Sequence, residues 1–266
     1  MRFELAASAL LLTGFWPSPA WAWTDATRRR MVDDAIRMSP PALATVLERY
    51  RSDLVHGMSD PARAESGEDH RQHVSGTYGG AAGKIAFHSE QAVKIIGQPG
   101  RLRLAVYALG TAAHYVADVN FPLNCISGPV GDPVFYGDYA RYSEKMMRHF
   151  PVVLDRKPTP DLDRNSLEVF GKKAAQRSSQ YVAPIQAAYT PGGKPRSAAA
   201  FDEKSIPFGV ASLSYSQTVN DIARLWAHLW NRAGGDLAGQ PFPQGGTTGK
   251  VGPAKKNQGG KRGDDR

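Results

Sequence analysis

The sequence predicts an all-α protein, a single-domain irregular helical bundle. Between Trp23 and Leu237 apolar residues recur at intervals of three to four in most segments, which is typical of helices that bury one face. No stretch shows the sustained apolar and polar alternation that a half-buried strand requires. No internal repeat is present, and 266 residues with 41% hydrophobic content are enough for one buried core. These observations favour one bundle over a sheet or a repeat array.

The first two predicted helices are separated by a pair of prolines. Thr24 or Asp25 can cap the first helix, in which apolar residues recur as far as Met38. Pro40 and Pro41 end this helix and start the next one. The apolar stripe of the second helix consists of Leu43, Val46, Leu47, Tyr50 and Leu54.

A polar stretch, residues 59–83, interrupts the helical pattern and contains several side chains able to bind metal. Beyond it, helical patterning predicts helices over residues 84–96 and 101–119, divided by a Gln-Pro-Gly break. After a loop rich in proline and glycine, further helices are expected over residues 136–150, 165–189 and 214–233.

The N-terminal segment, residues 1–22, has the pattern of a signal peptide. An apolar stretch from Leu5 to Trp16 is followed by Ala20-Trp21-Ala22, a small-x-small cleavage pattern. An uncleaved anchor is the alternative, but about 12 apolar residues are fewer than the roughly 20 that a membrane-spanning helix needs. We therefore expect cleavage after Ala22 and export to the periplasm or the medium, with no transmembrane segment in the mature form.

The C-terminal segment, residues 238–266, predicts a disordered basic tail behind a helical domain of residues 23–237. The tail is rich in glycine, glutamine and lysine and has almost no apolar residue beyond Phe242. It carries half of the formal net charge of +8, so contact with an anionic surface is an expected role beside simple solvation. The single cysteine, Cys125, excludes an intramolecular disulfide, so packing or metal must stabilise the exported protein.

The most informative motif lies within residues 107–124. His114 and Asp118 are four residues apart on a predicted helix, which puts their Cβ atoms about 5–6 Å apart on one face. An imidazole and a carboxylate at this spacing can share one metal ion, although the same pair also occurs as a plain hydrogen-bonded couple. The apolar surroundings predict burial, and a buried charge needs a partner or a metal.

This motif, with the following Pro122-Leu123, resembles the central helix of zinc-dependent phospholipase C and the related single-strand-specific nucleases. Those enzymes begin, after signal cleavage, with a tryptophan whose amino group and carbonyl bind zinc, and Trp23 stands at the predicted cut. Trp226 with Ala233-Gly234 resembles the closing helix of the family. The resemblance covers most of the chain and implies an all-helical fold and a phosphodiester hydrolase that uses zinc.

The resemblance also implies roles for particular residues. Asp118 matches the bridging carboxylate of the family and His114 its neighbouring zinc ligand. Asp60 resembles the early aspartate that is a ligand and a candidate catalytic base. The histidine between them is His73 or His70, and the branched residue that follows His73 favours His73. About one zinc ion is therefore expected, bound by Asp60, His73, His114 and Asp118, which are ligand types that zinc accepts.

The sequence departs from the family where the other metal ligands stand. Residues 28–30 are three arginines where the family has a histidine, and Asn124 stands in place of another. Tyr136 and Ala140 stand where a histidine and a glutamate are expected. A site built from the later ligands is therefore lost, unless Asp132, Asp138 or Cys125 substitutes in a shifted register, and the site that uses Trp23 is weakened.

Two functions follow from this partial set of ligands. The first is an exported zinc-dependent phosphodiester hydrolase of the phospholipase C type, weakened by the missing ligands, acting on phospholipid or nucleic acid. The second is a non-catalytic member of the fold that binds a lipid head group, nucleic acid or an envelope partner. The retained histidines and aspartates favour the enzyme, and the missing histidines favour the binding protein.

Overall fold

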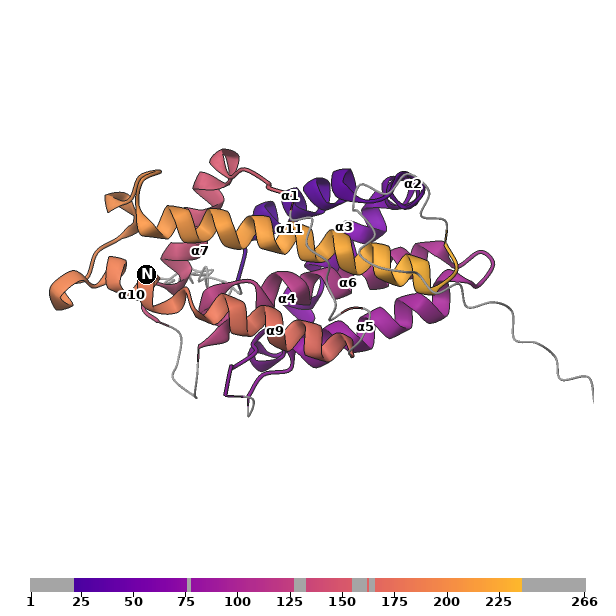
Figure 1. Ribbon diagram of the computed structural model, residues 1–266, viewed down its shortest axis with the longest axis horizontal. Coiled ribbons are helices and arrows are strands. Elements are labelled where there is room, and N and C mark those ends of the chain that lie inside the picture. Colours follow the sequence, from indigo (N-terminus) through magenta and orange to yellow (C-terminus); the bar gives the residue numbers. More distant parts are fainter. Residues whose placement is uncertain (1–21, 76–77, 127–132, 155–161, 163–165, 236–266) are drawn as a thin grey trace, which may run out of the picture.

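The computed structural model describes residues 22–75, 78–126, 133–154, 162 and 166–235, and every regular element among them is helical (Figure 1). The prediction of an all-helical bundle is thereby confirmed. In chain order the α-helices are α1 Asp25–Met38, α2 Pro41–Arg49, α3 Arg51–Ser59, α4 Pro61–Ala64, α5 Ala81–Ile96, α6 Leu102–Val119, α7 Tyr136–Met146, α9 Leu167–Ser179, α10 Val182–Tyr189 and α11 Ile206–Arg232. Short 3₁₀ turns include η1 Gly67–His70 and η2 Pro122–Cys125.

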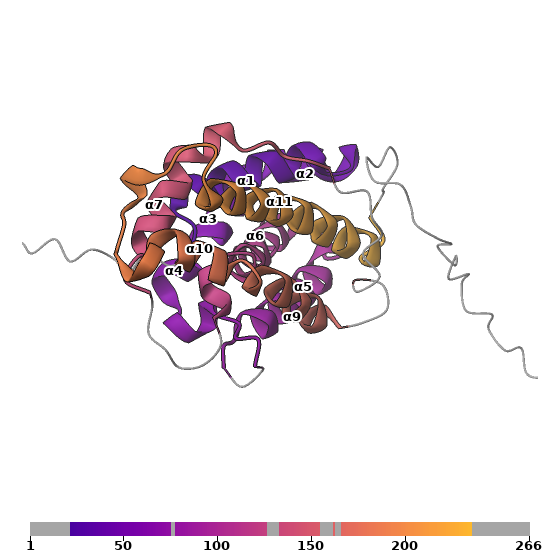
Figure 2. The same cartoon turned by 60° about the vertical axis from the view of Figure 1, so that its left-hand side comes forward.

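Helix α6 forms the centre of the bundle and contacts α3, α5, α9 and α11 (Figure 2). Every residue from Ala108 to Val119 is buried. A helix that is covered on all sides is apolar on all its faces. In this buried stretch, the side chains of the types that commonly bind metal are His114 and Asp118. The core of the fold therefore surrounds the motif that the sequence singled out.

Two glycines allow α3 and α6 to approach with their backbones almost in contact. A Cβ atom on Gly57 would lie 2.1 Å from the carbonyl oxygen of Tyr107, and one on Gly110 would lie 2.2 Å from that of Leu54. Real Cβ atoms do not come so close to backbone oxygen, so both positions require glycine. This close packing brings the C-terminal end of α3 against the middle of α6.

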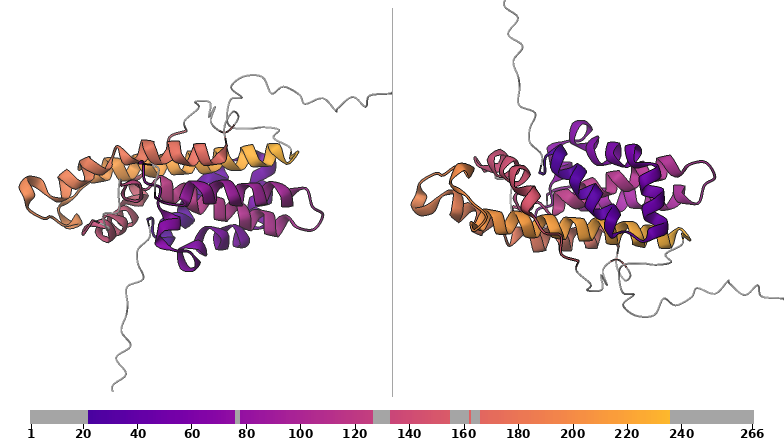
Figure 3. Two further views of the ribbon diagram at one scale, coloured as in Figure 1. Left: turned by 90° about the horizontal axis from the view of Figure 1, so that it is seen from below. Right: turned by 90° about the horizontal axis from the view of Figure 1, so that it is seen from above.

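Helix α11 runs along the length of the bundle, beside α1 (Figure 3). It begins at Ile206, earlier than the predicted start at residue 214, because Ser205 caps it and Pro207 occupies its first turn. The indole of Trp226 on α11 donates a hydrogen bond to the carbonyl of Leu109, 3.0 Å away. The closing helix is thus fastened to the central one.

Several predicted boundaries differ from those observed. The second predicted helix is divided into α2 and α3 at Tyr50, and the stretch predicted as one helix over 165–189 is divided into α9 and α10. The polar stretch 59–83 contains α4 and the turn η1, because Pro61 starts a short helix and Ser66 with Asp69 forms a capping box. Most of the predicted signal peptide and the predicted basic tail lie outside the described residues. Within the described ranges, no helix combines the length and apolar character needed to cross a bilayer.

Candidate metal centre

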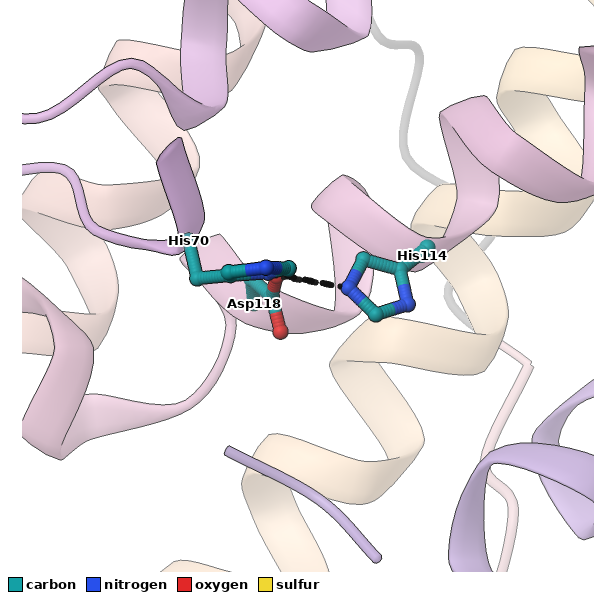
Figure 4. A group of neighbouring side chains, drawn as sticks. All are labelled: His70, His114 and Asp118. Atoms are coloured by element: carbon teal, nitrogen blue, oxygen red, sulfur yellow. Dashed lines mark hydrogen bonds and ion pairs between the residues drawn. The ribbon is translucent and has the colours of Figure 1, made fainter. Parts of the chain in front are cut away.

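His70, His114 and Asp118 form a fully buried group inside the bundle, which we call the metal group (Figure 4). His70 Nδ1 lies 2.7 Å from Asp118 Oδ2 and 3.0 Å from His114 Nε2. His114 Nε2 lies 3.1 Å from the same carboxylate oxygen. Three donor atoms from two separate elements, η1 and α6, therefore converge on one point.

His70 is held in place by its own turn and by the loop beyond α6. The side chain of Ser66 contacts Asp69 Oδ2 at 2.8 Å in the capping box that starts η1. Asn124 Nδ2 donates to the carbonyl oxygen of His70 at 2.9 Å. The ring of Tyr115 stacks on the His70 imidazole, with centroids 5.7 Å apart. These contacts fix both the backbone and the ring plane of His70.

His114 is oriented by the carbonyl oxygen of Met58, at the end of α3. This oxygen lies 2.8 Å from His114 Nδ1 and can only accept, so Nδ1 carries a proton and Nε2 faces the metal group. Burial lowers the pKa of His114, and this effect outweighs the attraction of Asp118. A neutral imidazole with a lone pair on Nε2 is the result, which is the form that binds metal.

Asp118 is ionised although it is fully buried. Burial opposes its ionisation, but the contacts with His114 and His70 outweigh burial and hold the pKa of this carboxyl below its usual range. Its oxygen Oδ2 faces the two imidazoles. Its other oxygen, Oδ1, accepts no hydrogen bond from the described residues and lies 3.5 Å from Nη2 of Arg28.

The metal group fits a metal ion by the spacing and the chemistry of its donor atoms. In a tetrahedral zinc site with bonds of about 2.0–2.1 Å, neighbouring donor atoms lie roughly 3.3 Å apart. The three separations here are 2.7, 3.0 and 3.1 Å. Because Nδ1 of His114 donates to Met58, Nε2 of the neutral ring is an acceptor, and it faces Oδ2 of Asp118. A metal ion between these atoms would satisfy both acceptors.

Two of the residues expected as ligands lie away from this group. Asp60 is half-buried at the end of α3, and its Oδ2 accepts a hydrogen bond of 3.1 Å from the hydroxyl of Tyr107, two turns of α6 before His114. His73 is buried, and its Nδ1 bonds the carbonyl of Ile126. The structure thus brings His70 into the metal group, where the sequence favoured His73. The reason is the 3₁₀ turn, which directs His70 inward and ends before His73.

Trp23 is buried close to the C-terminal end of α6. Its indole donates to the carbonyl of Ala117, 3.1 Å away, and packs edge-on against Phe121 with centroids 5.2 Å apart. Trp23 is therefore fixed beside Asp118 through the neighbouring residue of α6.

Asn124 and Tyr136 belong to a second buried polar group, which we call the tyrosine network. The backbone N–H of Ala22 donates to the Tyr136 hydroxyl at 2.6 Å, and this hydroxyl donates to Asn124 Oδ1. The amide of Asn124 in turn donates to the carbonyl of His70. Ala140 is buried and has no polar side-chain atom. Of the positions where the resemblance expects further ligands, Asn124 therefore supports His70 directly and Tyr136 supports it through Asn124.

The contact between Arg28 and Asp118 was not predicted from the sequence. Arg28 is 2% exposed, and it belongs to the arginine run that stands where the resemblance expects a histidine. A long cationic side chain at a position expected to bind metal was the available signal, but the sequence alone does not show which of the three arginines points inward.

The described fold is similar to the folds of two bacterial toxins. Alpha-toxin of Clostridium perfringens, from avian strain SWCP, is 13% identical and superimposes with a TM-score of 0.63 over 81% of this chain and 67% of that chain. Alpha-toxin of Clostridium absonum is 14% identical, with a TM-score of 0.62 over 80% of this chain and 67% of that chain. The sequence matches no protein-family model and no curated protein. These similarities confirm the all-helical fold of the phospholipase C type.

Proposed function

We propose that the protein is an exported phosphodiester hydrolase of the phospholipase C type that binds one zinc ion through His70, His114 and Asp118. The convergence of two imidazoles and one carboxylate, all fully buried, carries this proposal. Two nitrogen ligands and one oxygen ligand are a typical protein donor set for catalytic zinc, which keeps one position open. The donor set replaces the one expected from the sequence, with His70 in the place of His73 and without Asp60.

A zinc ion bound by these residues would lower the pKa of a water molecule and polarise a phosphoryl oxygen. The chain itself supplies the orientation of the ligands. Met58 fixes the tautomer of His114, and Asn124 with Tyr115 fixes His70. Arg28 adds a permanent positive charge beside Asp118, so the loaded group is net positive and suits an anionic phosphodiester.

Asp60 remains our candidate for the catalytic base. Its carboxylate accepts a hydrogen bond from Tyr107 and is half-buried rather than sealed in the core, so substrate or water can reach it. To act on the metal group it must release Tyr107, because two turns of α6 separate that residue from His114. A Tyr107→Phe variant with an altered pH profile of hydrolysis, against an unchanged zinc content, would support this role.

We propose phospholipid as the substrate class, with nucleic acid as the alternative. The resemblance of the central motif to phospholipase C and the helical fold shared with the alpha-toxins support the lipid. The mature protein is proposed to begin at Trp23, with residues 23–237 as the helical domain and the basic tail as a contact for anionic lipid.

The second candidate function is binding without catalysis. The tyrosine network and Ala140 favour it, because they replace ligands of a multi-metal site by neutral groups that are already hydrogen-bonded or apolar. A protein with this arrangement would retain zinc as a structural ion and bind a phosphate-containing head group without cleaving it.

Hydrolysis assays on purified full-length and mature protein decide between these functions. Phosphatidylcholine vesicles and single-stranded DNA are incubated with zinc-loaded and chelator-treated protein, with His114→Ala as the inactive control and His73→Ala as the matched active control. We expect release of phosphocholine that needs zinc and His114. Zinc binding without hydrolysis of either substrate would favour the non-catalytic function, and cleavage of DNA alone would make nucleic acid the substrate.

A further inference from the structure

Arg28 is a buried cation that faces the oxygen of Asp118 turned away from the two histidines. Its side chain is 3% exposed, and Nη2 lies 3.5 Å from Asp118 Oδ1. Its Nη1 lies 3.7 Å from Asp25 Oδ1, on the preceding turn of α1. Arginine stays protonated at every pH that a protein survives, so this charge is permanent. Asp118 therefore lies between a fixed cation on one side and the two histidines of the metal group on the other.

The contact between Arg28 and Asp118 is electrostatic rather than a short hydrogen bond. Charge-assisted N–H···O bonds have lengths of about 2.7–2.9 Å, whereas this separation is 3.5 Å. Oδ1 accepts no hydrogen bond within the described part of the chain. The guanidinium neutralises the carboxylate through space in an interior where screening is weak.

The surroundings of Oδ1 offer no second set of metal ligands. Among the described residues, the group of His70, His114 and Asp118 is the only one in which three potential ligand atoms converge. Asn124 and Tyr136 hydrogen-bond each other in the tyrosine network. A cation on this side of Asp118 would have to displace Arg28, since both would use the same oxygen.

We propose that Arg28 is a built-in counter-ion of Asp118 that limits the site to one metal ion and weakens the binding of that ion. This inference rests on the proposed zinc site and assigns it an occupancy and a controlling residue. Arg28 and the metal ion share the negative charge of Asp118. Because both are cations, they repel each other across this carboxylate, which weakens metal binding. Removal of the guanidinium leaves Asp118 without a counter-ion in the metal-free protein, so the metal then binds more tightly.

The test is a zinc titration of the full-length chain and of three variants. Arg28→Met keeps an unbranched, flexible side chain and removes its charge. Arg28→Gln is a second neutral variant, and Arg28→Lys keeps the charge. We expect both neutral variants to bind zinc at least tenfold more tightly than the parent, and the lysine variant to stay within threefold. We also expect the metal-free neutral variants to melt at lower temperature and to gain more from added zinc. If one neutral variant does not fold, the other supplies the comparison.

The outcomes separate this inference from the proposed function. Unchanged or weaker zinc binding in a folded neutral variant, with normal binding by the parent, would overturn the role of Arg28 alone. Zinc binding by a neutral variant but not by the parent would support the role of Arg28 and remove the proposed zinc enzyme. No zinc binding by any of these proteins would overturn both.

Discussion

Two buried polar groups meet at His70, and they differ in how completely their hydrogen bonds are made. In the tyrosine network every step has a donor and an acceptor, from the hydroxyl of Tyr136 through Asn124 to the carbonyl of His70. In the metal group, on the imidazole side of the same residue, a neutral His114 nitrogen faces an ionised oxygen of Asp118 at 3.1 Å. One group is complete as it stands, and in the other two acceptor atoms face each other at a distance that fits a shared metal ion.

This difference indicates that the tyrosine network serves stability and that the metal group serves ligand binding, although the two groups share His70. Buried polar groups are almost always satisfied, because an unmade hydrogen bond in the interior costs about 1–3 kcal/mol. A group that breaks this rule beside one that obeys it is a candidate for ligand binding. Substitutions in the tyrosine network should therefore change stability, and substitutions in the metal group should change metal affinity.

The largest expected effect separates His70 from His73. His70→Ala removes one of three converging donors, so zinc affinity should fall by more than the roughly 100-fold that loss of an outer-shell partner costs. His73→Ala is the matched control, because His73 bonds the carbonyl of Ile126 and lies outside the metal group. Isothermal titration of both variants measures the difference, and a greater loss with His73→Ala would return the ligand role to His73.

A second prediction concerns the scaffold that holds His114 against Met58. Gly110→Ala places a Cβ 2.2 Å from the Leu54 carbonyl, so α3 and α6 must separate and the free energy of unfolding should fall by roughly 2–3 kcal/mol. Gly209 is exposed on α11, and a Cβ atom added there would have no neighbour within 4 Å. Gly209→Ala should therefore stabilise the helix by about 0.5–1 kcal/mol. Urea unfolding of both variants checks the pair, and equal effects would contradict the close approach.

The smallest expected effect compares two buried tyrosines. Tyr136→Phe leaves the side-chain oxygen of Asn124 without its donor, at a cost of about 1–3 kcal/mol in stability. The hydroxyl of Tyr115 has no hydrogen-bond partner among the described residues, so Tyr115→Phe should be nearly neutral. Zinc affinity should stay within about tenfold of the parent in both variants, because tenfold is the smallest loss of affinity that is typical of an outer-shell change. If Tyr136→Phe reduces the free energy of zinc binding by more than it reduces the free energy of unfolding, the tyrosine network belongs to the metal site.

The helical architecture could be predicted from the sequence because periodicity, capping residues and prolines act locally. Boundaries were missed where tertiary contacts or caps decide them, as at Ser205 before α11. His114 and Asp118 could be paired from their spacing on one helix, which depends only on helix geometry. The choice between His70 and His73 depends on a 3₁₀ turn, and the position of Arg28 depends on how α1 packs on α6. Such long-range contacts have no signature in the local sequence.

Elemental analysis of the purified protein, with His114→Ala beside it, tests the central claim most directly. His114 Nε2 converges on His70 and Asp118, and its Nδ1 is held by Met58, so no other described residue can replace it. We predict one zinc ion per chain in the parent and none in His114→Ala, with helical content retained in both by circular dichroism. Three zinc ions in the parent, or an unchanged zinc content in His114→Ala, would contradict the single buried site.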